Sequence, residues 1–205
     1  MKAPDQKEAW DELYRSQSRP WKGTISNRTP FPFKKGDKVL DIGCGNGKTS
    51  SALIEEGYDV TGIDISDTAV EACKGSYGDK MKVICAPCDS IPLNDGSMDG
   101  TVMIHVLEHL DEDELKSTVK ELIRVLRTDP KIFVRVFHTD DMRSERGERI
   151  DDRTIIRGNG IRYRYFTETE LKDIFSEFHC ISMERIDERT KFKTTRVRIE
   201  AVFEK

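Results

Sequence analysis

The feature that most constrains this chain is a glycine loop between two apolar strands. Residues 39–47 read Val-Leu-Asp-Ile-Gly-Cys-Gly-Asn-Gly, and a helix-forming stretch and then residues 60–64 (Val-Thr-Gly-Ile-Asp) follow. A buried strand, a glycine turn, a helix and a second strand that ends in an acid are typical of nucleotide-binding βαβ units. The glycines have G-x-G-x-G spacing, one residue closer than in the dinucleotide fingerprint. The pattern therefore predicts an α/β fold with a ligand on the loop.

Two acids narrow the chemistry of that ligand. Asp41 lies two residues before the first glycine, where it would repel a diphosphate and favour a cationic amine. Asp64 ends the second strand, where an acid accepts hydrogen bonds from ribose hydroxyls. A nucleoside with a positively charged amino-acid tail is S-adenosylmethionine.

Four segments in order resemble the motif series of class I S-adenosylmethionine-dependent methyltransferases, and in particular the methyltransferase type 11 and tellurite-resistance-like small-molecule groups. They are residues 39–47, Asp64, residues 88–93 and residues 99–110. The likeness covers about residues 38–137. It implies a seven-stranded, doubly wound, mostly parallel sheet with a C-terminal antiparallel hairpin. It also implies S-adenosylmethionine as cofactor and S-adenosylhomocysteine as product.

Bulk properties fit one soluble domain over residues 1–205. The net charge of -4 argues against non-specific nucleic-acid binding, and no segment approaches a membrane span of about 20 apolar residues. The first ten residues contain no apolar signal core. Five cysteines form no disulfide pattern, which favours a reduced, cytoplasmic setting. We expect a monomer or a homodimer.

Hydrophobic periodicity predicts the elements of such a sheet. Strands are expected at 38–42, 59–63, 82–86, 101–106, 131–137, 180–186 and 195–203. Helices are expected at 6–16, 49–56, 68–75, 111–127 and 168–178. Residues 1–36 form an N-terminal arm outside the sheet. Residues 138–165 interrupt the alternation, either as a solvated loop or as a lid over the substrate.

The cofactor site is expected along the ends of the first four strands. The glycines let the backbone approach the methionine portion, and by resemblance Asp89 accepts from the adenine amine, while Ser90 and Ile91 offer a backbone amide and an apolar surface to the ring. The predicted cofactor-binding residues are Asp41, Gly43, Cys44, Gly45, Gly47, Asp64, Ile65, Asp89, Ser90, Ile91 and His105.

His105, Glu108 and His109 cluster where the fourth strand ends. By resemblance this exit lines the space near the reactive methyl, so His105 is the expected catalytic neighbour of the transferred group. A structural role for Glu108 and His109 is the alternative. No triad is required, because a sulfonium methyl is already activated and orientation supplies much of the rate.

Cys85 and Cys88 form a C-x-x-C pair that invites a metal or redox interpretation. Structural zinc needs four ligands, and no second pair lies nearby in the sequence. We therefore expect no metal, and interpret both cysteines as small buried apolar side chains.

Three functions fit these patterns. The first is methyl transfer to a small-molecule acceptor, with Trp21, His109, Tyr163 and Tyr165 as candidate substrate contacts beneath an aromatic arm that includes Trp10 and Tyr14. The second is tRNA methylation, because residues 162–166 read Arg-Tyr-Arg-Tyr-Phe and basic residues among aromatics can stack bases and neutralise phosphate. The third is a non-catalytic S-adenosylmethionine-binding partner subunit, against which the intact Asp41 and Asp64 argue. We favour the small molecule.

Overall fold

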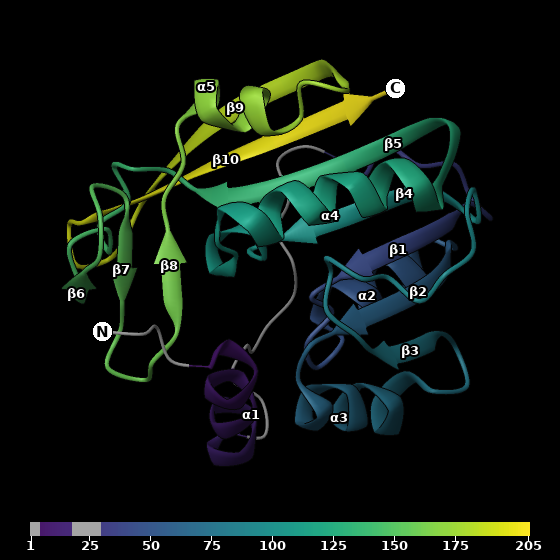
Figure 1. The fold of residues 1–205 in the computed structure, drawn as a ribbon, viewed down its shortest axis with the longest axis horizontal. Coiled ribbons are helices and arrows are strands. Elements are labelled where there is room, and N and C mark those ends of the chain that lie inside the picture. Colours follow the sequence, from purple (N-terminus) through teal and green to yellow (C-terminus); the bar gives the residue numbers. More distant parts are fainter. Residues whose placement is uncertain (1–4, 18–29) are drawn as a thin grey trace.

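A seven-stranded sheet forms the centre of the computed structural model, which describes residues 5–17 and 30–205 (Figure 1). The strand order is β3-β2-β1-β4-β5-β10-β9, and β10 runs antiparallel to both of its neighbours. The predicted fold class is therefore confirmed. The strands are β1 (Lys38–Ile42), β2 (Asp59–Asp64), β3 (Lys82–Cys85), β4 (Met98–Ile104), β5 (Leu126–Phe137), β9 (His179–Arg189) and β10 (Thr195–Glu204).

Helices cover both faces of this sheet, as in a doubly wound fold. They are α2 (Lys48–Glu55), α3 (Asp67–Tyr77), α4 (Glu112–Val125) and α5 (Glu168–Ile174), whereas α1 (Gln6–Ser16) packs against α3. In β5, Ile132 and Val134 join the core cluster that includes Leu122 of α4. Phe133, between them, points to the other face and joins the cluster that includes Leu53 of α2. Within the described residues, no helix has the length and apolarity needed to cross a bilayer.

The order of the strands determines where a ligand can bind. Strands β1, β2 and β4 are parallel and adjacent, so their carboxyl ends meet at one edge of the sheet. The chain reverses its direction of winding at β1, which is the point where open α/β sheets bind ligands. The glycine loop that follows β1 and the acid that ends β2 both lie at this edge.

Residues 138–165 are not the solvated loop that one interpretation of the sequence allowed. They contain an antiparallel sheet of β6 (Glu148–Arg149), β7 (Thr154–Ile156) and β8 (Arg162–Arg164). Its apolar residues Ile155 and Ile161 pack with Phe137 of β5 in a third core cluster, against which Trp10 of α1 also packs. Figure 1 shows this sheet and α1 standing side by side at the open end of the main sheet.

The N-terminal helix is attached through a buried carboxylate. Asp11 accepts a hydrogen bond from the Ser66 hydroxyl (2.6 Å) and one from the Thr68 amide (3.2 Å), at the start of α3. Lys7 of α1 donates to Asp11 and also to Asp67, the first residue of α3. These bonds lower the pKa of Asp11 to about 2, although burial opposes the shift. Helix α1 is thereby held over the edge where the ligand is expected.

Several predicted boundaries differ from the observed ones. Helix α4 passes directly into β5 at Leu126, five residues before the predicted start of that strand. Strand β4 ends at Ile104, because His105 takes a left-handed backbone conformation (φ 58°) that stops the strand. Helix α5 ends at Ile174, and β9 continues to Arg189 in a longer hairpin than expected.

Replacing Asp11 by alanine should release α1 from α3. Ser66 and Thr68 lose a charged acceptor, so we expect the free energy of unfolding to fall by about 1–3 kcal/mol in chemical denaturation. Glu12→Ala is the matched control, since Glu12 is exposed and paired only with Arg15 on the same helix. Equal stability of the two variants would contradict this role for Asp11.

Candidate active site

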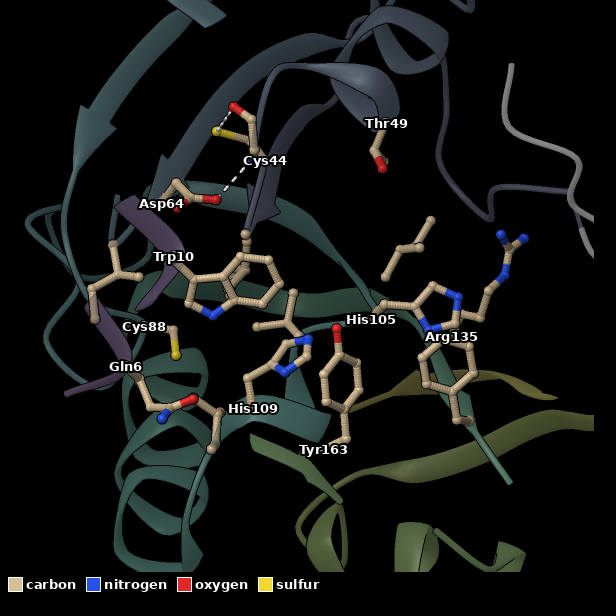
Figure 2. A pocket seen from close by; sticks show the side chains of 18 of the residues that line it. Gln6, Trp10, Cys44, Thr49, Asp64, Cys88, His105, His109, Arg135 and Tyr163 are labelled. Carbon is tan, nitrogen blue, oxygen red and sulfur yellow. Dashed lines mark hydrogen bonds between the residues drawn. The ribbon is translucent and has the colours of Figure 1, made fainter. Parts of the chain in front are cut away.

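A cavity of about 800 Å³ opens at the carboxyl edge of the sheet, within the range of small-molecule sites. The glycine loop and the end of β2 form one end of it, and β5, β9 and β10 form the other. Helix α1 and strand β8 lie across the space between the two ends. Figure 2 shows the lining side chains, with Asp64 and Arg135 on opposite sides and Trp10, His109 and Tyr163 between them.

The glycine loop has the backbone that its sequence requires. Gly43, Gly45 and Gly47 all have positive φ, a region that residues with a Cβ rarely adopt. A Cβ at Gly45 would also collide with the Tyr14 hydroxyl of α1, so the loop and the helix fit only with glycine there. The cavity lining includes Gly43, Cys44 and Gly45. Gly47 lies outside the lining and is the N-cap of helix α2.

Asp64 is the acid that lies where the sequence predicted it, at the cavity wall. One carboxylate oxygen accepts the Gly45 amide (2.8 Å) and the other accepts the Ser66 amide (2.9 Å). Burial raises the pKa of Asp64 to about 6, while the two amide bonds oppose the rise. Each carboxylate oxygen has a second lone pair that can accept from a ligand hydroxyl. Ile65, the next residue, also lines the cavity.

Asp41 lies beneath the loop and not in the cavity lining. Its side chain is buried and accepts the Ser50 hydroxyl of α2 (2.6 Å). Burial raises its pKa to about 7, and the nearby Asp64 adds to the rise. Asp41 therefore does not face the cavity, where a direct contact with a cationic amine was expected. Helix α2 packs on this face of the sheet and buries the Asp41 side chain.

The segment after β3 is divided between cavity and core. Asp89 lines the cavity, as the adenine-binding prediction requires. Ser90 and Ile91 do not line it: Ile91 packs in the main core, and its amide donates to the carboxylate of Glu121 on α4 (2.7 Å). Because that amide is engaged by α4, it is not free to contact a base in this conformation.

His105 and Glu108 form a hydrogen-bonded pair at the end of β4. The Nδ1 atom of His105 lies 2.9 Å from Glu108 Oε1, and the same oxygen accepts the Phe137 amide. The imidazole stacks on the Phe137 ring at 4.0 Å between centroids. Left-handed backbone at a residue with a side chain is uncommon and is concentrated at functional sites.

The protonation of this pair follows from its surroundings. Burial lowers the pKa of His105 well below its usual value, and four arginines around the ring lower it further. Burial raises the pKa of Glu108 to about 7. Both shifts disfavour an imidazolium–carboxylate pair, so His105 is neutral at pH 7. With Nδ1 facing Glu108, the second ring nitrogen, Nε2, is the one left to meet a ligand.

His109 contacts both helix α1 and strand β8, and its side chain lines the cavity. Its Nδ1 donates to the carbonyl of Arg162 on β8 (2.6 Å). The ring packs edge-on against Trp10 (4.7 Å) and Tyr163 (4.9 Å), and all three side chains line the cavity (Figure 2). Tyr165, also a predicted substrate contact, is buried behind the lining and donates to the Arg143 carbonyl. Trp21, a further predicted contact, lies outside the described residues.

Six cationic side chains line the end of the cavity away from Asp64, and the sequence analysis did not identify them as functional. They come from α2, β5, β10 and the segment of residues 138–165. They are Lys48, Arg135, Arg143, Arg157, Arg196 and Arg198. The detectable signal was the alternation Arg-x-Arg-x-Glu at residues 196–200, which places all three charged residues on one face of a strand.

The two cysteines differ from the expectation that both are buried. Cys85 is exposed, and Cys88 is half-buried at the cavity, where it accepts the Thr118 hydroxyl. Among residues 5–17 and 30–205, no group of His, Cys, Asp and Glu side chains could hold a metal ion.

We expect elemental analysis of protein prepared without chelator to give far less than one zinc per chain. The reason is that Cys85 and Cys88 have no further ligands around them to complete a tetrahedral site. Cys180→Ser serves as a matched control, because Cys180 lies on the far side of the sheet in β9. Stoichiometric zinc that is lost in Cys88→Ser and retained in Cys180→Ser would overturn this prediction.

Comparisons with known proteins agree with this geometry. Residues 40–134 match the family model described as "Methyltransferase domain". The tRNA N(3)-cytidine methyltransferase METTL2 of Bos taurus is 28% identical over 153 residues, which cover 68% of this chain and 40% of that protein. O-methyltransferase 3 of Dictyostelium discoideum is 31% identical over 153 residues, which cover 67% of this chain and 35% of that protein.

A solved structure extends the likeness beyond residues 40–134 to most of the chain. The SAM-dependent methyltransferase of Methanosarcina mazei superposes with a TM-score of 0.75 at 23% identity, over 86% of this chain and 98% of that one. The chain spans less than half the length of the curated relatives named above. With its motifs, fold and family match together, the chain belongs to the class I S-adenosylmethionine-dependent methyltransferases, with its methyltransferase domain over residues 40–134.

Proposed function

We propose that this protein transfers the methyl group of S-adenosylmethionine to a small-molecule acceptor. The observation that supports it best is the cavity described above, which has Asp64, the candidate acceptor for the ribose, at one end and His105 beside the other. Its volume suits a cofactor together with a small second ligand. Helix α1 and strand β8 cover it, which suits a reaction that must exclude water.

The residues at the glycine-loop end fit the cofactor. Asp64 is the candidate acceptor for the ribose hydroxyls, and Asp89 for the adenine amine. The loop backbone at Gly43 and Gly45, which lines the cavity, would lie against the methionine portion. When bound, S-adenosylmethionine supplies a methyl group already activated by a sulfonium. The protein's task is then to orient the acceptor and, where the acceptor atom carries a proton, to remove that proton.

His105 is our candidate for the proton acceptor. It is neutral at pH 7, it lines the cavity, and Glu108 fixes its ring through Nδ1. An imidazole held in this way presents the Nε2 lone pair to a hydroxyl or amine of the acceptor. Glu108 acts through His105 and is a positioning residue: it has no exposed surface of its own with which to touch a substrate.

The cover over the cavity is held by one glutamine. The amide group of Gln6 in α1 donates to the Gly160 carbonyl (3.2 Å) and accepts from the Arg162 amide (2.9 Å). Trp10 adds an apolar contact on His109. Because the two covering elements meet in this way, residues 138–165 are proposed as the substrate lid together with α1. Entry of an acceptor requires them to separate.

Transfer to tRNA is the second candidate, favoured by the similarity to tRNA N(3)-cytidine methyltransferases. The side chains that suggested RNA are engaged within the protein. Arg162 pairs with Glu114 (3.2 Å) and Arg164 with Glu170 (2.6 Å). Tyr163 and Tyr165 are 5% and 1% exposed, which leaves no ring surface for base stacking. These contacts favour the small molecule.

A direct test is to follow S-adenosylhomocysteine release with a panel of small phenols, amines and carboxylic acids, and in parallel with bulk tRNA. We expect turnover with a panel member and none with tRNA. The double variant Arg162→Ala/Arg164→Ala should be less stable, because it loses its ion pairs. Its S-adenosylhomocysteine release should not depend on tRNA. Labelled methyl in tRNA, lost in that double variant, would replace the small-molecule proposal by the tRNA one.

Replacing Asp64 by alanine should weaken S-adenosylhomocysteine binding about tenfold to a hundredfold in calorimetry, the range for a hydrogen bond to a charged group. Asp59→Ala is the matched control, because Asp59 begins the same strand at its opposite end and is exposed. Unchanged affinity in Asp64→Ala would remove Asp64 from the cofactor site.

Replacing His105 by alanine should lower kcat with an accepted panel member by about a hundredfold or more, the typical range for a general base. In the unmodified protein, burial and arginines lower the pKa of His105, so the ring is protonated only on the acid side of its usual value. The rate should therefore rise with pH up to a midpoint below 6.5 and stay level above it.

Glu108→Gln should give a smaller loss of kcat, and His179→Ala, at an exposed histidine that begins β9, should give none. An acid limb that persists in His105→Ala, or a rate equal to that of the unmodified protein, would contradict the role of His105 as base.

A further inference from the structure

The cationic end of the cavity is built by the register of two antiparallel strands. Arg196 and Arg198 alternate on β10, and Glu200 follows on the same face. Glu200 lies directly opposite Arg135 of β5, and Arg198 lies opposite Phe137. Three arginines from two strands thus share one face of the sheet, beside the ring of His105, which rests on Phe137.

Part of this positive charge is neutralised within the protein. Arg135 pairs with Glu200 (2.7 Å), Arg198 with Glu188 (3.0 Å) and Arg143 with Asp141 (3.0 Å). For Arg143 and Arg198 these pairs leave donor atoms without a partner. The Nη2 atom of Arg143 and the Nε atom of Arg198 are buried without a hydrogen-bond partner among the described residues.

Arg196 and Arg157 stand apart, because neither has a carboxylate partner among the described residues. The guanidinium of Arg157 lies 3.6 Å over the Tyr163 ring and donates to the Tyr165 hydroxyl, and its Nε is buried without a partner. The Nε of Arg196 is likewise buried without a partner. Burial disfavours the charge of Arg196 and the cations Arg143 and Arg198 repel it, while Asp141 and Glu188 attract it without forming an ion pair. Residues 1–4 and 18–29 contain no Asp or Glu, so the rest of the sequence holds no side-chain carboxylate that could pair with Arg196 or Arg157.

The position of this cluster separates it from the cofactor end. Asp64 ends β2, whereas the arginines come from β5 and β10, on the other side of β1 and β4 in the sheet order. His105 follows β4, the strand between β1 and β5 in this order. In Figure 2, Arg135 and His105 are neighbours on the side of the cavity opposite Asp64. The cofactor carries one carboxylate, which is too little negative charge to neutralise this many arginines.

We propose that the methyl acceptor carries a carboxylate or phosphate group, and that Arg196, with Arg198 and Arg143, binds it inside this cavity. This inference rests on the proposed function and specifies its substrate class. A guanidinium carries several N–H donors in a fixed planar fork, which matches the planar or tetrahedral oxyanion of such a group, with two donors to two oxygens. An acceptor anchored there would extend toward His105, with its nucleophilic atom between the histidine and the cofactor end.

An enclosed anion site favours a small acid over a nucleic acid. Helix α1 and strand β8 cover the cavity, and Gln6 joins them through the Arg162 amide. A polynucleotide tracks along exposed, uncompensated charge. Burial also strengthens each ion contact, because the local dielectric is lower than at the surface.

The test measures anion binding without methyl transfer. The protein is loaded with S-adenosylhomocysteine, and its thermal unfolding midpoint is followed as inorganic phosphate or benzoate is added at constant ionic strength set with sodium chloride. Arg196→Met removes the charge and keeps the side-chain stem, and Arg198→Met is a second variant should the first fail to fold. Arg189→Met is the matched control, since Arg189 is an exposed arginine at the end of β9, next to β10.

We expect phosphate or benzoate to stabilise the unmodified protein and Arg189→Met equally. Their affinity should fall about tenfold or more in Arg196→Met, as for the loss of one charge-assisted hydrogen bond. No stabilisation of the unmodified protein, or equal stabilisation of Arg196→Met, would overturn the anion site. Salt-sensitive tRNA binding that Arg196→Met abolishes, with no response to the small anions, would overturn the small-acceptor class.

A second arm keeps the two proposals separate. Any panel member that accepts methyl is compared with its uncharged amide, and the acid should react at least tenfold faster in kcat/KM. Equal rates for the acid and its amide would overturn the anionic acceptor. Anion binding that depends on Arg196 without methylation of any panel member would refute the proposed function and leave the anion site standing.

Discussion

The arrangement of the site depends on the two hydrogen bonds that Asp64 accepts. One holds the Gly45 amide and so fixes the glycine loop, and the other holds the Ser66 amide at the start of α3. The Ser66 hydroxyl in turn donates to Asp11, which fastens α1. Helix α1 then places Trp10 on His109. The acid that is proposed to hold the ribose is therefore connected through one hydroxyl to the helix that covers the cavity, so loss of Asp64 would disturb both.

The sheet also separates two kinds of charge. The acids Asp64 and Asp89 line the cavity at the end of β2 and after β3, and arginines gather on β5 and β10. A cationic cofactor and an anionic acceptor would each meet the opposite charge at its own end. The reacting atoms would then meet near β4, where the sharp turn at His105 interrupts the strand. Opposite charges at the two ends orient both ligands before any bond is made.

The sequence predicted what local pattern determines. The first strand, the glycine loop and the acid after β2 depend on neighbours in the chain, and α1 was predicted to the residue at 6–16. The rest depends on contacts between distant segments. The Ile91 amide donates to Glu121, thirty residues later in the chain. Arg135 meets Glu200 only because of the register between β5 and β10. The small sheet of residues 148–164 has strands of two and three residues, too short for a periodic signal.

His105 and the arginine cluster influence each other through their charges. Burial is the main reason that the pKa of His105 is low, and Arg135, Arg198, Arg196 and Arg143 repel a proton from the ring. An anion bound among these arginines would offset that repulsion and raise the pKa of His105 toward its usual value. A ring with a higher pKa holds a proton more strongly and is a better base. Binding of an acidic acceptor would thus strengthen the base that activates it, while a neutral molecule in the cavity would leave the histidine a weak one.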